Sequence, residues 1–186
     1  FFAMYANTDN IDPRKFDVDY KNLEEIDKWL LSKYNKLIKN VTDNMENYDL
    51  NKVVHYLNDF VTEDLSNWYI RRNRRRFWTS NLDNSKKAVY KTTYDVLVGL
   101  AKMIAPIVPF VSENLYTKLT DEESVHLANF PQYDESLIDL KIEEKMDTVR
   151  DLISLGRKIR EDVKIKVRQP IQEVILDQKL KSVIGD

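Results

Sequence analysis

The feature that most constrains this chain is its shortage of residues that interrupt helices. Only three glycines and five prolines occur among 186 residues. Over most of the length, apolar side chains recur every three or four residues, which places them on one face of an α-helix. We therefore predict an all-α fold, a bundle of about five amphipathic helices.

The ends of several helices are marked by capping residues. Asn22, followed by Glu25 three residues later, is predicted to start the first helix through a capping box. Asp49 is a good N-cap for the second helix, and Pro109 suits the first turn of the fourth. Phe110 and Val111 are expected to point inward from that fourth helix. The predicted helices cover about 22–48, 50–68 with a continuation into the following arginines, 85–104, 109–119 and 139–162.

The C-terminal residues follow a different pattern. The sequence IQEVILD (171–177) alternates, so it could form a short strand that starts another unit. The aromatic N-terminus, FFAMYANTDNID, has no basic leader and does not resemble a signal peptide. Both ends are consistent with a piece of a longer protein.

Composition excludes several functional classes. The formal net charge is only −2, so attraction to a polyanion must come from local patches. The absence of cysteine excludes disulfides and thiolate metal sites, and it suits a reducing compartment such as the cytoplasm. His55 and His126 are too far apart in the sequence to suggest a zinc site. No apolar run reaches the roughly 18 residues of a membrane span.

The strongest charge cluster lies in LSNWYIRRNRRRFW (65–78). Like charges one helical turn apart are mildly destabilising, so this cluster requires an explanation. On a wheel of about 100° per residue, the apolar face ending with Leu65 and Trp68 continues into the arginines. The wheel places Arg71, Arg72 and Arg75 over the edge of the core, where a carboxylate such as Asp64 could pair with them. It places Arg74 and Arg76 on the two flanks of the helix, and Asn73 pointing away from the core.

Three explanations of the arginine run remain open. It could be a solvated helix end, where cations suit the helix dipole. It could bind the phosphates of a nucleic acid, with Arg74 and Arg76 on phosphate and Phe77 and Trp78 as candidates for base stacking. It could also bind a protein partner with an acidic surface.

A second basic stretch, GRKIREDVKIKVRQP (156–170), favours the phosphate explanation. Two separated clusters in a chain of net charge −2 mean that acidic residues are concentrated elsewhere, and such segregation favours a polyanion-binding face over scattered solubilising charge. A basic helix end beside a polar linker is the alternative. The stretch contains Arg157, Lys158, Arg160, Lys164, Lys166 and Arg168.

The sequence contains no recognisable catalytic or phosphate-loop motif. Gly99, Gly156 and Gly185 are isolated, so there is no glycine-rich loop. A serine-centred nucleophile elbow and a cysteine–histidine pair are also absent, and acidic pairs such as Glu143–Glu144 suit solvated surfaces. We therefore expect no catalytic residue, metal or cofactor in this chain.

Five motifs, in this order, resemble the anticodon-binding helical domain of isoleucyl-tRNA synthetase, a class I aminoacyl-tRNA synthetase. The resemblance covers nearly the whole chain. The stretches NWYIRRNRRRFW and KVRQP point to the isoleucine enzyme, whereas IAPIVPF and the tryptophan-containing first helix are shared with valyl- and leucyl-tRNA synthetases. The motifs are IDKWLLSKYNKLI (26–38), DLSNWYIRRNRRRFW (64–78), LAKMIAPIVPFVSENLY (100–116), ESVHLANFP (123–131) and LGRKIREDVKIKVRQPI (155–171).

The resemblance implies a division of the chain and a function. Residues 1–20 would leave a catalytic domain, 21–163 would form the anticodon-binding bundle, and 164–186 would link to a C-terminal region. The parent protein would join isoleucine to tRNA using ATP and Mg²⁺ in a domain that carries the class I signatures, which are absent here. This part would bind the anticodon stem and loop. The alternatives are a helical protein-interaction module, or the same domain of a valyl- or leucyl-tRNA synthetase.

The residues expected to touch tRNA come from both basic stretches. They are Arg71, Arg72, Arg74, Arg75, Arg76, Trp78, Arg157, Arg160, Lys164, Lys166 and Arg168. The partners implied are tRNA and the remaining domains of the same polypeptide.

Overall fold

A computed structural model describes residues 1–177 and 180. The chain forms two compact units, Phe1–Ile138 and Asp139–Asp186. The described residues contain helices, turns and connecting segments but no strand, which confirms the all-α class. None of the described helices is both long and apolar enough to cross a membrane.

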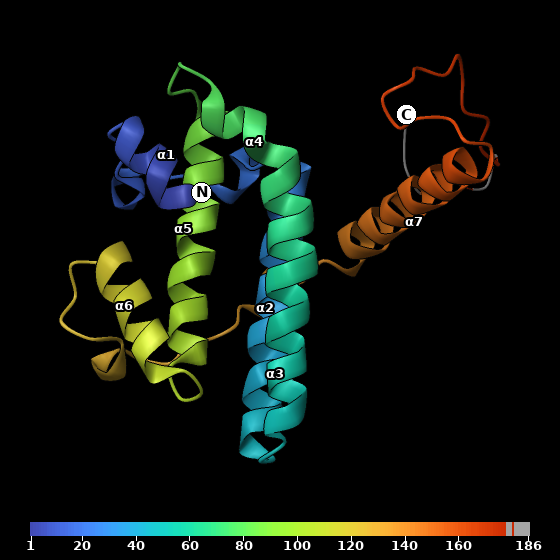
Figure 1. Ribbon diagram of the computed structural model, residues 1–186. Helices are drawn as coiled ribbons and strands as arrows, with labels where there is room; N and C mark the ends of the chain where they lie inside the picture. The colour runs from blue at the N-terminus through green and yellow to red at the C-terminus, as the bar shows by residue number, and fades with distance from the viewer. Residues whose placement is uncertain (178–179, 181–186) are drawn as a thin grey trace. The chain divides into compact units, whose positions relative to one another are not determined.

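The first unit contains six α-helices and one π-helical stretch among its described residues (Figure 1). The second unit contains α7, Leu140–Asp162. Four short 3₁₀ turns lie at Pro13–Lys15, Tyr20–Asn22, Val125–Leu127 and Glu135–Leu137. The elements of the first unit are α1 (Phe2–Thr8), α2 (Glu25–Glu46), α3 (Leu50–Asp59), the π-helical stretch Phe60–Ile70, α4 (Arg71–Trp78), α5 (Asn84–Ile104) and α6 (Pro109–Leu119).

Most of the helix starts follow the capping residues in the sequence. The side chain of Asp49 accepts a hydrogen bond from the backbone N–H of Lys52, and Asp139 caps α7 in the same way. Pro109 occupies the first turn of α6 as predicted. The expected start at Asn22 is wrong, because Asn22 ends a 3₁₀ turn and the capping box is formed by Glu24 and Asp27.

The core of the first unit lies between α2, α5 and the continuous helix made by α3, the π-helical stretch and α4. Its largest fully buried side chains are aromatic: Trp29, Tyr69, Tyr90 and Phe77. In Figure 1, α6 lies beside α5 and α1 covers the upper part of α5. The core is therefore built by three long helices, and α1 and α6 both pack against α5.

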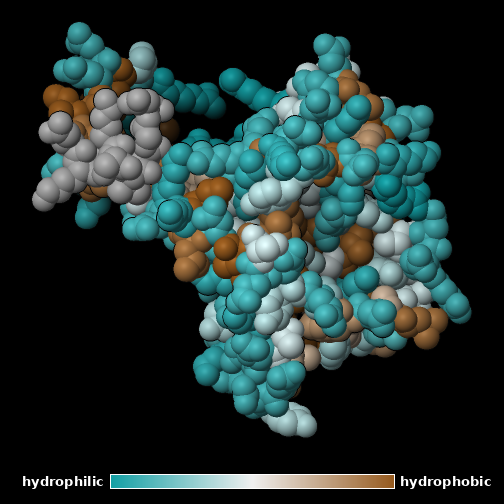
Figure 2. Space-filling model, turned by 180° about the vertical axis from the view of Figure 1, so that it is seen from behind, coloured by the Kyte–Doolittle hydropathy of each residue, from teal (hydrophilic) through white to brown (hydrophobic). Residues whose placement is uncertain are grey.

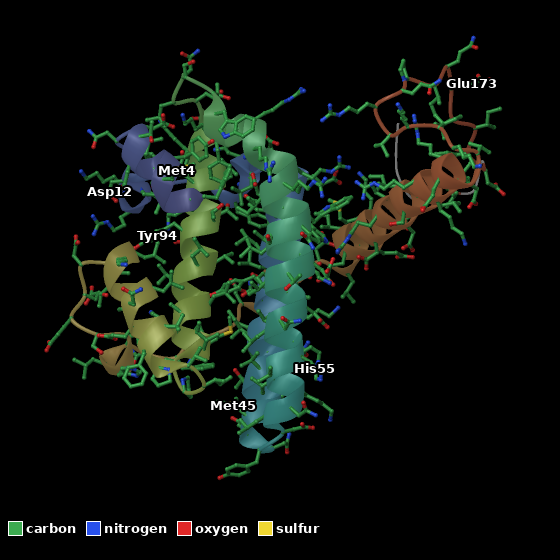
Figure 3. The ribbon with its side chains drawn as sticks, in the orientation of Figure 1. Met4, Asp12, Met45, His55, Tyr94 and Glu173 are labelled. Carbon is green, nitrogen blue, oxygen red and sulfur yellow. The ribbon has the colours of Figure 1, made fainter. Side chains whose placement is uncertain are left out.

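The N-terminal residues, expected only to leave another domain, fold against α5. Asp9 accepts a hydrogen bond of 2.7 Å from Lys86 of α5, and Arg14 pairs with Asp12 and Asp121. Figure 3 shows Met4 and Asp12 in this segment beside α5, from which Tyr94 projects, and His55 on the outer side of α3. The segment is thus part of the first unit.

The surface in Figure 2 is mostly hydrophilic, with apolar patches between the charged side chains. Phe110 is 89% exposed and Val111 is also exposed, so the expectation that they face inward is wrong. The buried face of α6 is made by Ser112 and Tyr116 instead. Ser112 donates a hydrogen bond to the carbonyl of Ala101, which fixes the rotation of α6 on α5.

The predicted strand at 171–177 is absent from the described residues. A strand needs a neighbouring strand for its backbone hydrogen bonds. The described part of the second unit contains no other strand that could pair with this segment. The division between the two units, after Ile138, falls inside the range 21–163 expected for the bundle. Residues 178, 179 and 181–186 of the expected linker lie outside the described residues.

Candidate nucleic-acid interface

The arginine run is carried by a helix that changes its winding just before the run begins. Residues Phe60–Ile70 are π-helical, and the α-helix resumes at Arg71. Bonds from i to i+5 turn the chain less per residue than an α-helix does. Over these eleven residues the lag behind an α-helical wheel accumulates to roughly half a turn.

The half-turn reverses the faces expected for α4. Asn73, expected to point away, is buried, and Phe77 one turn later is buried too. The expectation that Arg71, Arg72 and Arg75 cover the core edge is wrong, because all three are exposed, as is Arg74. Asp64, expected to pair with these arginines, pairs instead with Lys33 of α2 at 3.4 Å.

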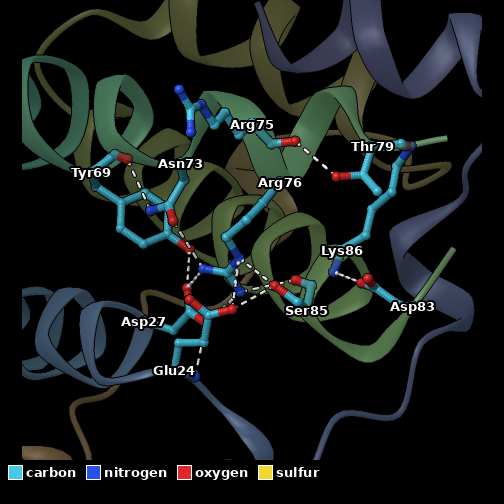
Figure 4. Close-up of polar contacts among 10 residues, drawn as sticks. All are labelled: Glu24, Asp27, Tyr69, Asn73, Arg75, Arg76, Thr79, Asp83, Ser85 and Lys86. Carbon is cyan, nitrogen blue, oxygen red and sulfur yellow. Dashed lines mark hydrogen bonds and ion pairs between the residues drawn. The ribbon is translucent and has the colours of Figure 1, made fainter. Parts of the chain in front are cut away.

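Arg76 is the exception within the run. Its side chain is only 12% exposed and forms a two-pronged ion pair with Asp27 of α2, which is fully buried. Nη1 and Nη2 donate to the two carboxylate oxygens at 2.8 Å each. Expected on a flank and available to phosphate, Arg76 is instead joined to the start of α2 (Figure 4).

The other donors of Arg76 are also taken up within the protein. Nη1 donates to the side-chain oxygen of Asn73 at 3.0 Å, and Nη2 donates to the carbonyl of Ser85 at 2.9 Å. Nε donates to the hydroxyl of Ser85 at 2.8 Å and lies 3.3 Å from Glu24. A guanidinium has five N–H donors, and these acceptors account for all five.

Asp27 and Asn73 connect Arg76 to the π-helical stretch. The hydroxyl of Tyr69 donates to Asp27 at 2.6 Å, and the side-chain amide of Asn73 donates to the carbonyl of Tyr69 at 2.9 Å. We call Asp27, Tyr69, Asn73, Arg76 and Ser85 the Arg76 network. It joins α2, the end of the π-helical stretch, α4 and the start of α5.

The ionisation of the network is set by burial and by the ion pair. Burial lowers the pKa of Arg76, but the hydrogen bonds to Asp27 and the charge of that carboxylate outweigh burial, so its pKa lies above the ordinary value. Burial, followed by the charge of Asp27, raises the pKa of Tyr69 well above the ordinary value. Arg76 therefore stays charged, and Tyr69 stays a neutral donor.

Aromatic side chains flank the exposed arginines. The guanidinium of Arg72 lies 4.6 Å from the ring centre of Trp68, within the range of a cation–π contact. Trp68 is only partly buried, so its expected role as a core anchor is wrong, and its neighbour Tyr69 fills the core instead. Trp78 is 52% exposed, whereas Phe77 packs edge-on against Tyr90 with 4.9 Å between ring centres.

The second basic cluster lies in the second unit. Arg157, Lys158, Lys164, Lys166 and Arg168 are exposed. Arg160 is partly buried, and its Nη1 donates to the carbonyls of Lys166 and Gln169 at 3.0 and 2.9 Å. Arg160 thereby holds the turn that follows α7, while the other five cations face solvent.

The sequence did not reveal Asp27 as the acidic partner of Arg76. Asp27 lies 49 positions from Arg76, in an amphipathic helix where a buried aspartate is unusual. Its position between the apolar residues Ile26 and Trp29 was the available signal. Lys86 was also missed; it is 2% exposed on α5 and binds Asp9.

The exposed side of α4 carries cations that suit an anionic ligand. Arg71, Arg72, Arg74 and Arg75 present planar, permanently charged groups that match phosphate geometry. The described residues contain no group of three or more histidine, cysteine, aspartate or glutamate side chains that could hold a metal.

Comparison with known proteins connects this surface to a family. Residues 27–176 match the family described as "Anticodon-binding domain of tRNA ligase". The chain is 42% identical to the isoleucine–tRNA ligase of Clostridium novyi over all of its own length and 18% of that protein. It is also 42% identical to the isoleucine–tRNA ligases of Bacteroides thetaiotaomicron and Chlamydia trachomatis, over 95% of this chain and 16% and 17% of those proteins.

The chain thus spans less than a fifth of the length of these relatives. The matched family region includes every helix from α3 to α7 and nearly all of α2, and it contains both basic clusters. The chain belongs to the anticodon-binding domain family of tRNA ligases.

Proposed function

We propose that this chain binds the anticodon stem and loop of a tRNA, as part of an isoleucine–tRNA ligase. The observation that carries the proposal is the exposed side of α4. Arg71, Arg72, Arg74 and Arg75 face solvent together there, beside the partly exposed Trp68 and the exposed Trp78. Arginines of this kind bind backbone phosphates, and aromatic rings can stack on unpaired bases.

The ligase activity belongs to the proposed longer protein. It would join isoleucine to its tRNA with ATP and Mg²⁺, in the cytoplasm, using a catalytic domain of the same polypeptide. The present sequence lacks a glycine-rich phosphate loop, and no step of that reaction is assigned to its residues. Its task is to hold the tRNA while the reaction occurs elsewhere.

The exposed cations of the second unit would add a further set of phosphate contacts. Arg157, Lys164, Lys166 and Arg168 are exposed. Arg160 contributes indirectly, by holding the turn that presents Lys166. Trp78 is the best stacking candidate of the first unit, because more than half of its surface is free.

Filter binding with an isoleucine tRNA transcript over a series of salt concentrations tests this proposal. Affinity should fall steeply with salt, and Arg72→Ala and Arg75→Ala should each reduce the log–log slope by about 0.7 to 0.9. Lys52→Ala is the matched control, because Lys52 is an exposed cation at the opposite end of the same continuous helix. No retention of tRNA at low salt, or a flat response to salt, would contradict the proposal. Binding of an acidic protein instead would point to the interaction-module alternative.

A further inference from the structure

The five arginines of α4 differ in what they can offer to a ligand. Four of them, Arg71, Arg72, Arg74 and Arg75, have exposed side chains. Arg76 has none of its five donors free, because Asp27, Asn73 and Ser85 accept them all. Contact between Arg76 and a phosphate would require breaking an ion pair whose carboxylate is fully buried. That exchange would leave Asp27 buried without its cation, which is strongly unfavourable.

The same network fixes the rotation of α4. Arg76 is held against the first turn of α2, and Asn73 is held one turn earlier by the carbonyl of Tyr69. These two anchors lie on one side of α4. Because the helix is rigid, fixing that side also fixes the direction of the opposite side, on which the exposed arginines lie.

The winding of the preceding stretch makes such anchors necessary. The α-helical wheel alone would turn Arg71, Arg72 and Arg75 toward the core. The π-helical stretch Phe60–Ile70 reverses this arrangement. Long π-helical segments are rare, since an ordinary α-helix is the usual alternative. Strong contacts at the end of the stretch are therefore needed to hold the reversed phase.

We propose that Arg76, through its ion pair with Asp27, is a positioning residue that orients Arg72 and Arg75 toward tRNA without touching the tRNA itself. This inference rests on the proposed function. Arg72 is the most directly affected member, because it lies one turn before Arg76 and rests on Trp68. If long side chains are already oriented before the ligand arrives, less conformational entropy is lost on binding.

Asp27→Asn gives the sharpest test, because simple electrostatics predicts the opposite result. Removing a negative charge near an RNA-binding surface should leave tRNA binding unchanged or tighten it. The positioning role predicts that binding weakens about fivefold, or about 1 kcal/mol at 1.4 kcal/mol per tenfold. Asp27 is fully buried, so a direct contact with RNA does not explain a loss.

Asp64→Asn is the matched control. Asp64 is also a buried carboxylate that joins the long helix to α2 through a cation, Lys33, but it is outside the Arg76 network. Its replacement removes the same charge and should leave affinity unchanged or slightly higher. Binding is measured well below the melting midpoint of each variant, since a contact that only stabilises the fold does not alter affinity when nearly all molecules are folded.

A double-mutant cycle and chemical labelling separate positioning from direct contact. In an Arg72→Ala background, Asp27→Asn should cost less affinity than it does in the wild type, because part of its effect passes through Arg72. In the wild type without tRNA, an arginine-directed dicarbonyl reagent should modify the exposed Arg71, Arg72, Arg74 and Arg75 and spare Arg76. Bound tRNA should protect the exposed arginines and leave Arg76 unlabelled as before. This labelling needs no variant to fold.

The outcomes distinguish the two proposals. If the wild type does not bind the tRNA transcript, the proposed function is overturned and the positioning role with it. If the wild type binds and the Asp27→Asn and Asp64→Asn proteins bind equally well, only the positioning role is overturned. Rapid labelling of Arg76 that tRNA suppresses would show direct contact and would also overturn it.

Discussion

The hydroxyl oxygen of Tyr34 on α2 occupies the space that a side chain at Gly99 on α5 would need. A Cβ built at Gly99 would lie 1.5 Å from that oxygen and 2.7 Å from the ring carbon that carries it. The two helices pack closely at this point because residue 99 has no side chain. This contact gives an isolated glycine of the sequence a clear structural role.

Gly99→Ala should therefore destabilise the first unit by about 1–3 kcal/mol, the usual cost of overpacking a core. In an open helix the same change stabilises by about 1 kcal/mol. Gly156→Ala in α7 is the control, because no atom lies within 4 Å of its built Cβ. Chemical denaturation of both variants measures the difference, and a Gly99→Ala protein as stable as the wild type would show that Tyr34 moves aside at little cost.

Phe77 and Trp78 are neighbours in the sequence with opposite environments. Phe77 is fully buried against Tyr90, whereas Trp78 is largely exposed. Phe77→Ala should cost about 3–5 kcal/mol of unfolding free energy, and Trp78→Ala should cost far less. Thermal melts of the two variants check this order. Equal losses would mean that the tilted ring contact of Trp78 with Tyr5 contributes as much to stability as the burial of Phe77.

Lys86 is a buried cation whose partner comes from the N-terminal segment. It donates to Asp9 and to the carbonyl of Thr79. Lys86→Met should cost about 2–3 kcal/mol, because both acceptors lose a charged donor. Lys91→Met, in a partly exposed pair with Asp95 on the same helix, should cost less, about 1 kcal/mol or below. Comparable losses from urea unfolding of the two variants would contradict this assignment.

Stability should fall at alkaline pH because several buried or partly buried tyrosines resist ionisation. Burial raises the pKa of Tyr34, Tyr69 and Tyr90 in the folded state, while in the unfolded chain a tyrosine ionises near pH 10. A raised folded pKa contributes stability below the unfolded value and loses it above. Each such group gives up about 1.4 kcal/mol per pH unit above about pH 10, until its folded pKa is reached.

Tyr69→Phe tests this pH dependence. The variant lacks one of the phenols whose pKa is raised by burial, so its unfolding free energy should fall less steeply above about pH 10 than that of the wild type. Its stability at neutral pH should be lower, because the hydrogen bond to Asp27 is lost. Urea denaturation at several pH values, followed by fluorescence, measures both effects. An unchanged alkaline slope would mean that Tyr69 ionises without unfolding.

The sequence predicted the helices well wherever a local signal marked their ends. Asp49, Pro109 and Asp139 each begin or cap the expected element, because capping depends on a few neighbouring atoms. The all-α class follows from periodicity for the same local reason. The start of α2 was misplaced by three residues because Asn22 and Glu24 offer competing caps.

The rotation of α4 could not be predicted from the sequence. A helical wheel assumes α-helical winding, and nothing local distinguishes Phe60–Ile70 from an ordinary α-helix. Across this stretch and α4, the buried positions Phe60, Leu65, Tyr69, Asn73 and Phe77 are spaced by four or five residues, a pattern that is visible only once burial is known. The partner of Arg76 depends on tertiary contact with α2 and is equally hidden. The sequence thus predicted the exposed and buried faces of α4 the wrong way round.

The π-helical stretch also determines where this protein can change length. One residue more or less between Thr79 and Asp83 alters only the connection that precedes α5. One residue more or less between Phe60 and Ile70 would rotate α4 by roughly 80–100° and carry Arg76 away from Asp27. Insertions and deletions should therefore be tolerated between Thr79 and Asp83 but not within Phe60–Ile70. The number of residues from Phe60 to Arg76 determines which arginines reach the surface.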